Sequence, residues 1–478
     1  MKNMLGWWMV LGVVAVVGVA VQTRGETTND TIKFRFGGDE RIREEAFDSI
    51  PIKADPPGVT RGGANNYFRF RTRVWGQANA NDKLILNVRA ANEFRLWDKP
   101  SPRPALQRSN YDFPDEVVFD TLNLQLRNLF NDNLDLCLGR QDLMYGNGRV
   151  MLDGTPKDGS RTIYFNAIKA TWKGIPDTTV DILGIYNPSK DKLAINDSDR
   201  DLTGLTSAND DMDESGGGVY VKNQSSKRLP FEAYGLYKRE SHYEIAATKD
   251  AKTGLFKPPP LAWQSLDAAR GMIDVPPLNL GTFGFRLMPL FNDELSGNLE
   301  AALQVGEQGG ENVMAYMVDA ALTEQLPWCT AVVPALSAGF YYLSGDDPAT
   351  GRNEGWNPLW ARWPQYSELY VYAFDADGAG RWSNLMMPHL DFVMSPATWL
   401  KTTVMGGYMT APVADGPGGG HNRGWLGVIK GEFTIKEKML TSCDALKGHL
   451  WLEVVKPGDY YKVSDTAYFA RWELAYSF

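Results

Sequence analysis

Hydrophobic and polar residues alternate along most of the chain after residue 30. In the segment 295–305, apolar residues such as Leu299 and Leu303 occupy one parity, and polar residues such as Asn298 and Glu300 occupy the other. The segments 83–97 and 121–127 repeat this pattern. Such alternation exceeds the usual strand length of a soluble sandwich and is typical of a tilted strand that crosses a membrane. The pattern therefore predicts transmembrane β-strands.

We count about 18 such runs, and the bounds of each carry an uncertainty of several residues. They cover 31–45, 67–79, 83–97, 117–129, 133–143, 161–173, 178–186, 217–223, 230–239, 279–287, 294–306, 312–323, 330–343, 383–394, 398–410, 424–434, 446–455 and 466–478.

The connections between these runs alternate in length. Short turns occur, for example, at 79–82 and 395–397, whereas long polar loops occupy 98–116, 187–216, 240–278 and 344–382. Outer-membrane barrels have this asymmetry, with short periplasmic turns and long external loops. The final run ends on Phe478 after alternating apolar residues, which resembles a closing barrel strand. Because every backbone group must be paired within lipid, the sequence predicts an all-β, closed, antiparallel up-and-down transmembrane β-barrel.

The N-terminal segment has a different character. Lys2 is followed by an uncharged apolar stretch from Leu5 to Val21 and by small residues that suit a cleavage site. This pattern predicts a cleaved export signal over residues 1–25, with an uncleaved anchor as the alternative. Residues 26–478 then form one barrel domain in the bacterial outer membrane.

Composition excludes several classes of function. The formal net charge of −9 disfavours nucleic acid as a partner. The three cysteines and four histidines are not spaced as a metal site. Carboxylate pairs such as Asp346/Asp347 and Asp210/Asp211 lie in loops, where no apolar frame raises their pKa for glycoside cleavage. We therefore expect that the protein is not an enzyme and holds no cofactor. Binding of Ca²⁺ by the loops 187–216 or 344–382 stays an open alternative.

The polar parity of a barrel strand faces the lumen, where its charge selects solutes. The first three strands and the last carry four acidic residues on this parity: Asp39, Glu45, Glu93 and Glu473. Eleven basic residues share it: Lys33, Arg35, Arg41, Arg43, Arg69, Arg71, Arg73, Lys83, Arg89, Arg95 and Arg471. Guanidinium groups pair with carboxylates in a bidentate manner. The pattern predicts a wall that guides anions; alternatively, the arginines only solvate the lumen and pair with neighbouring acids.

Two acidic residues conflict with simple alternation. Glu40 and Glu44 fall on the lipid parity of the first strand. Either the upper half of this strand leaves the membrane, or a bulge at Gly37-Gly38 shifts its register.

Several motifs resemble the alginate-export porin family over nearly the whole mature chain. The most specific pair is LGRQDLMYGNGR at 138–149 with RTIYFNAIK at 161–169. DERIRE at 39–44, FRTR at 70–73, SGDD at 344–347, GHLWLE at 448–453 and RWELAYSF at 471–478 resemble other parts of that family. The resemblance implies an 18-stranded barrel with an arginine-rich constriction that passes an anionic polysaccharide. By position it makes Arg73, Arg140, Arg149, Arg161 and Arg471 pore candidates, and places Lys169 where the family usually has Arg.

The first functional hypothesis is accordingly an outer-membrane channel whose basic lumen passes anionic polysaccharide or its oligomers. Its partners would be outer-membrane lipid, the saccharide and periplasmic polysaccharide-secretion components. The alternative is a general or substrate-specific porin for small sugars and anions, and a remoter one is a secreted soluble carbohydrate-binding protein or lyase. Trp356, Trp360, Trp363 and Trp382 could stack on sugar rings, or they could pack within their loop or in an interfacial belt.

Overall fold

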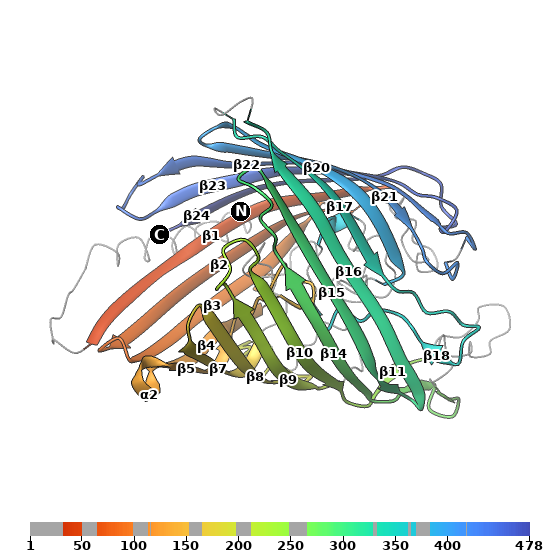
Figure 1. The fold of residues 1–478 in the computed structure, drawn as a ribbon, viewed down its shortest axis with the longest axis horizontal. Coiled ribbons are helices and arrows are strands. Elements are labelled where there is room, and N and C mark those ends of the chain that lie inside the picture. The colour runs from red at the N-terminus through yellow and green to blue at the C-terminus, as the bar shows by residue number, and fades with distance from the viewer. Residues whose placement is uncertain are drawn as a thin grey trace, which may run out of the picture.

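The computed structural model describes residues 32–49, 65–98, 113–114, 116–152, 165–196, 212–247, 265–327, 332–361, 365–369, 383–416 and 418–478. Their long strands form one antiparallel sheet that curves round and closes on itself (Figure 1). The predicted export signal lies outside these residues. Within them, no helix is long and apolar enough to cross a membrane.

Eighteen strands build the wall, which confirms the predicted fold class. They are β1 (Ile32–Asp48), β2 (Asn65–Ala80), β3 (Leu84–Trp97), β4 (Glu116–Asn128), β5 (Leu134–Gln141), β7 (Phe165–Ile175), β8 (Thr178–Asn187), β9 (Glu214–Asn223), β10 (Phe231–Glu240), β14 (Leu278–Leu287), β15 (Leu295–Gln308), β16 (Glu311–Gln325), β17 (Ala335–Leu343), β20 (Leu385–Ala397), β21 (Leu400–Thr410), β22 (Asn422–Glu437), β23 (Ala445–Lys456) and β24 (Ala467–Ser477).

The barrel closes between its first and last strands. β1 pairs with β24 from Asp39↔Ser477 to Asp48↔Tyr468. The terminal residue extends this seam, because Phe478 and Gly38 exchange two backbone hydrogen bonds of 3.0 and 3.1 Å. Closure leaves no free sheet edge, so the backbone polar groups of the wall are satisfied within lipid.

The outer face of the wall is apolar, as a lipid-facing surface must be. Many exposed side chains on it are large and hydrophobic, including Phe34, Ile168, Ile182, Phe283, Leu390, Ile429, Leu450 and Leu452. Glu40 and Glu44 lie on the same parity, because β1 pairs with β2 without a register shift from Ile32 to Phe47. The bulge offered for Gly37-Gly38 is therefore absent. Instead, Thr72 donates a hydrogen bond to Glu40, and Asn66 and Trp472 donate to Glu44.

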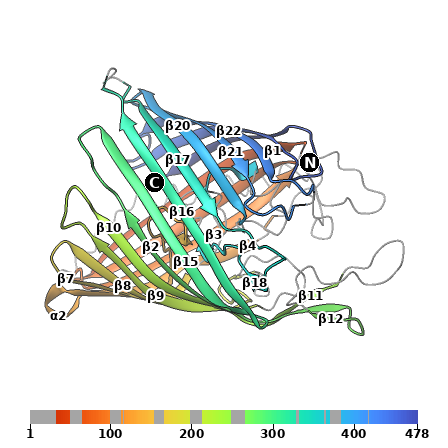
Figure 2. The ribbon, with the colours of Figure 1, turned by 45° about the vertical axis from the view of Figure 1, so that its right-hand side comes forward.

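The two ends of the barrel differ. The short turns include α2 (Leu129–Asp132), and the opposite end carries a three-stranded sheet of β11 (Tyr243–Ala246), β12 (Ser265–Asp267) and β13 (Met272–Val275) (Figure 2). One connection on the loop side is itself tight, because only two residues, 309–310, join β15 to β16. β18 (Arg352–Asn353) adds two residues in parallel to β16.

Candidate functional site in the barrel lumen

The chain turns inward after β5. Gly139 has φ +114°, and a Cβ at this position would lie 2.4 Å from the carbonyl oxygen of Leu122. Only glycine adopts this conformation readily here. The following residues, 142–152, run inside the barrel, and we call them the first inner segment. Residues 193–195 take the place that β5 vacates beside β4, where Ile195 N donates to the oxygen of Val117 at 2.6 Å.

Arg140 stands at this break in the wall. Its register partners are Leu122 and Asn166, and its guanidinium binds Asp191 at 2.8 Å and Asn166 at 3.0 Å. The side chains of Arg140 and Asp191 are 2% and 0% exposed. The contacts of this predicted pore residue therefore join β5, β7 and the segment after β8.

A second inner segment comprises residues 356–361 and 365–369. Its strand β19 (Trp360–Ala361) pairs in parallel with β6 (Met151–Leu152) of the first inner segment. The indole of Trp360 is fully buried and approaches Gly216 of β9, where a Cβ would lie 2.8 Å from a ring carbon. Trp356 and Trp360 thus pack inside the barrel, as the packing alternative proposed; Trp363 and Trp382 lie outside the described residues.

Arg149 fastens the two inner segments to the wall. Its Nε donates to Asp319 of β16 at 2.7 Å, and its other nitrogens donate to Gln365 and Tyr366 at 2.9 and 2.6 Å. Burial alone would lower the pKa of this guanidinium, but Asp319 and the two tyrosines Tyr366 and Tyr341 outweigh burial and raise the pKa well above its usual value. Arg149 therefore keeps its charge and acts as an anchor.

The second inner segment also covers the barrel seam. Glu453 of β23 accepts backbone hydrogen bonds from Glu368 at 2.9 Å and Leu369 at 3.1 Å. Glu368 in turn binds Arg471 at 2.8 Å. The side chains of Arg41, Arg43 and Arg471 are only 1–2% exposed, and ion pairs join them to Glu45, Glu93 and Glu473. These three arginines, predicted as pore residues, lie in a buried ionic layer.

Five other predicted arginines remain open to the lumen, and we call them the arginine track. Arg69, Arg71 and Arg73 follow one another on the inner face of β2, and Arg89 and Arg95 lie on β3. Their side chains are 10–24% exposed, and Arg95 is the most exposed. Each also contacts a carboxylate, such as Asp39, which binds both Arg71 and Arg73. The arginines therefore pair with neighbouring acids, as the alternative interpretation proposed, and their side chains are also partly exposed to the lumen.

Acidic residues on the opposite wall are covered. Glu300 of β15 is 1% exposed and accepts a hydrogen bond of 3.0 Å from the Tyr234 hydroxyl. Asp319 is 3% exposed and paired with Arg149. Lys238 of β10 neutralises Glu214 and Glu240, each at 2.9 Å. Glu300 and Asp319 are thus less exposed than the arginine track.

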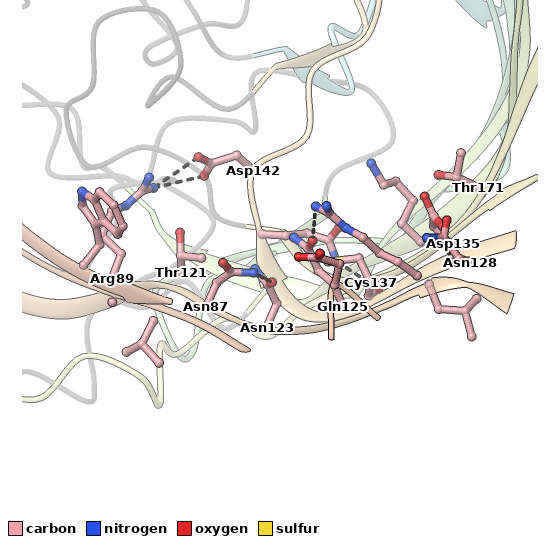
Figure 3. A pocket seen from close by; sticks show the side chains of 18 of the residues that line it. Asn87, Arg89, Thr121, Asn123, Gln125, Asn128, Asp135, Cys137, Asp142 and Thr171 are labelled. Atoms are coloured by element: carbon pink, nitrogen blue, oxygen red, sulfur yellow. Dashed lines mark hydrogen bonds and ion pairs between the residues drawn. The ribbon is translucent and has the colours of Figure 1, made fainter. Parts of the chain in front are cut away.

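A cavity of about 810 Å³ opens at the short-turn end, and we call it the vestibule. β2, β3, β4, β5 and β7 line it with Trp75, Asn87, Asn123, Gln125, Cys137 and Lys169, and Figure 3 shows Arg89 at one end of the row of lining residues, with Thr171 and Asp135 at the other. Arg89 is held there by Asp120 at 2.6 Å and Asp142 at 3.2 Å. Lys169, a predicted site residue, faces Cys137 in register. Arg161 lies outside the described residues.

Sequence reasoning did not single out the uncharged residues of the vestibule. Asn87 and Asn123 stand in register on neighbouring strands, and Gln77 of β2 stands in register with Asn87 beside the cavity. Their inward parity was readable from the alternation of each strand. Their alignment depends on cross-strand register, which the pattern of a single strand does not define.

No protein-family model matches the sequence, and no curated protein matches it significantly. Solved structures share its fold over nearly the whole chain. A BenF-like porin from Pseudomonas fluorescens Pf-5 is 9% identical, with a TM-score of 0.56 over 92% of this chain and 98% of that one. The outer membrane protein opdK from Pseudomonas aeruginosa is 9% identical, with a TM-score of 0.54 over 93% and 98%. OccAB4 from Acinetobacter baumannii is 10% identical, with a TM-score of 0.53 over 93% and 98%.

The chain has the fold of an outer-membrane porin. The fold and the apolar outer face confirm the predicted location in the bacterial outer membrane.

The assignment to the alginate-export porin family is wrong, because the structures that share the fold are Occ, Opd and BenF-like porins. The motif at 138–149 has a local explanation: Gly139 turns the chain inward and Arg149 anchors the first inner segment. These residues meet the needs of an inward-folded segment and do not identify a cargo. The fold likenesses support the coarser functional prediction, an outer-membrane channel with a porin fold.

Proposed function

We propose that the protein is a passive channel for small organic anions, above all carboxylates. One observation carries this proposal: the arginine track is 10–24% exposed, whereas carboxylates of the opposite wall such as Glu300 and Asp319 are buried. A solute that follows β2 and β3 therefore meets a row of partly exposed guanidinium groups, whereas Glu300 and Asp319 across the lumen are covered. Guanidinium groups bind carboxylates in a planar, bidentate manner and carry their charge at every physiological pH.

The inner segments support small solutes over polymers. Both segments lie across the interior and are fastened to the wall through Arg149, Lys238 and Glu453. A polymer would need these buried contacts to separate, whereas a small anion can move along the accessible wall. No residue of the arginine track needs to perform a chemical step, so transport rests on electrostatic selection alone.

Solute flux into proteoliposomes tests the proposal. Glutamate, glutamine and lysine have similar sizes and differ in net charge. A difference in entry rate between the anion glutamate and the cation lysine therefore reports selection by charge and not selection by size. We expect glutamate to enter fastest and lysine slowest. The triple variant Arg69→Gln, Arg73→Gln, Arg95→Gln should remove most of this difference, whereas Arg239→Gln, which removes an exposed charge outside the track, should not. Equal entry of glutamate and glutamine through the unaltered protein would overturn the proposal.

A further inference from the structure

The inward face of the wall changes character below the arginine track. On β2, the inward positions Arg69, Arg71 and Arg73 are followed by Trp75 and Gln77. On β3, Arg89 is followed by Asn87. β4 contributes Asn123 and Gln125 at the same level. A solute that leaves the track toward the short-turn end therefore meets amides and an indole, together with charged residues of both signs such as Arg127, Asp135 and Lys173.

The amides form a continuous row. Gln77 donates to Asn87 at 2.8 Å, Asn87 donates to Asn123 at 2.9 Å, and Asn123 donates to the carbonyl oxygen of Arg140 at 2.8 Å. Each primary amide has two N–H donors and two acceptor lone pairs, so every member keeps hydrogen-bonding capacity after these contacts. Figure 3 shows Asn87 and Asn123 side by side on the wall, with Gln125 beyond them. Such a row offers donors and acceptors together, which is what a hydroxyl group requires.

Trp75 gives the vestibule an aromatic surface. Its side chain lines the cavity, and the residue is 37% exposed. The indole lies over Gly37, where a Cβ would be 2.6 Å from a ring carbon. Gly37 thus leaves room for the ring close to the wall. A partly exposed indole next to amides provides apolar contact and hydrogen bonds to one ligand.

We propose that the vestibule is a binding station for polyhydroxylated solutes, so that the preferred cargo of the channel is a hydroxylated acid of sugar size. Trp75 receives the C–H face of the carbon chain or ring. Asn87, Asn123 and Gln125 exchange hydrogen bonds with its hydroxyls, and Arg89 or Lys169 takes its carboxylate. This inference rests on the proposed function, because the acid must first pass the arginine track.

Gluconate and hexanoate make the sharpest comparison, since both are six-carbon monocarboxylates and only gluconate carries hydroxyls. Each is added to single channels in planar bilayers that conduct KCl, and the concentration that halves the current is measured. We expect gluconate to act at about one tenth of the hexanoate concentration, the effect of one or two net hydrogen bonds. Trp75→Ala and Asn87→Ala should each reduce this preference to within about twofold, whereas Trp75→Phe should retain most of it. Trp399→Ala, at an exposed indole outside the cavity, is the matched control.

The outcomes separate the two proposals. An anion-selective channel that does not prefer gluconate, or that keeps the preference in both alanine variants, overturns the vestibule inference alone. A channel without anion selectivity overturns the proposed function as well.

Cys137 provides a second readout inside the cavity. It faces Gln125 in register and lines the vestibule. In a Cys329→Ser, Cys443→Ser variant, we expect gluconate to slow the reaction of Cys137 with a methanethiosulfonate reagent at least threefold, and hexanoate to leave the rate unchanged. Equal rates with and without gluconate would place any gluconate binding elsewhere and contradict the assignment.

Discussion

Arg471 of the last strand and Glu45 of the first form a buried ion pair across the barrel seam, with Nη2 2.6 Å from Oε1. The two residues are direct register partners and their side chains are 1% and 2% exposed. Glu45 also binds Arg43 at 2.8 Å, and Glu368 of the second inner segment binds Arg471. These buried ion pairs thus link the seam between β1 and β24 to the second inner segment.

Substitution of Arg471 by Gln should weaken the barrel strongly. The change leaves Glu45 and Glu368 buried without their shared partner, a loss that typically costs about 3–5 kcal/mol. We expect a fall of this size in the free energy of unfolding, measured by urea titration in lipid vesicles. Asp135→Asn provides the control, because Asp135 and Lys173 form a pair whose side chains are about one-third exposed, 31% and 34%. If both variants lose the same small amount, the seam does not depend on these buried ion pairs.

Substitution of Arg149 by Gln should enlarge the conducting path. Arg149 connects the first inner segment to Asp319, Gln365 and Tyr366, so its loss releases the first inner segment from Asp319 and from the second inner segment, which Lys238 and Glu453 still hold. Single-channel conductance in 1 M KCl should rise at least twofold, with larger current noise. Arg239→Gln should conduct as the unaltered protein does. An unchanged conductance in Arg149→Gln would show that the inner segments do not narrow the lumen.

Substitution of Gly216 by Ala tests the close packing of the second inner segment. An added Cβ would lie 2.1 Å from the oxygen of Tyr237 and 2.8 Å from the ring of Trp360. Overpacking of this kind costs about 1–3 kcal/mol, so assembly into a heat-resistant barrel should be impaired. Gly184→Ala on the neighbouring strand β8 meets nothing within 4 Å and should assemble normally. Equal assembly of the two variants, followed by electrophoresis without boiling, would contradict the packing.

Much of the wall follows from its sequence, because a membrane strand must alternate between lipid and lumen at every second residue. The eighteen wall strands and the inward parity of Arg69, Arg71 and Arg73 could be predicted on this basis. Strand starts were less accurate; one was predicted at residue 217, and the strand begins at Glu214.

The contents of the lumen could not be predicted in the same way. Val150, Met151 and Leu152 are apolar but belong to the first inner segment, where they are 0–1% exposed. A short apolar run does not reveal whether its partner is lipid or the inside of the barrel. Likewise, alternation placed Arg43 and Arg73 on the same face. In the structure the Arg43 side chain is 2% exposed within the ionic layer at the seam, whereas that of Arg73 is 15% exposed, a difference that alternation does not reveal.

The zero-current potential across a planar bilayer that separates 0.1 M from 1 M KCl tests the central claim most directly. The arginine track predicts that Cl⁻ crosses more readily than K⁺, so the potential should have the sign of an anion-selective pore. The preference should fall in the triple variant Arg69→Gln, Arg73→Gln, Arg95→Gln. A potential with the sign of a cation-selective pore in the unaltered protein would contradict the account.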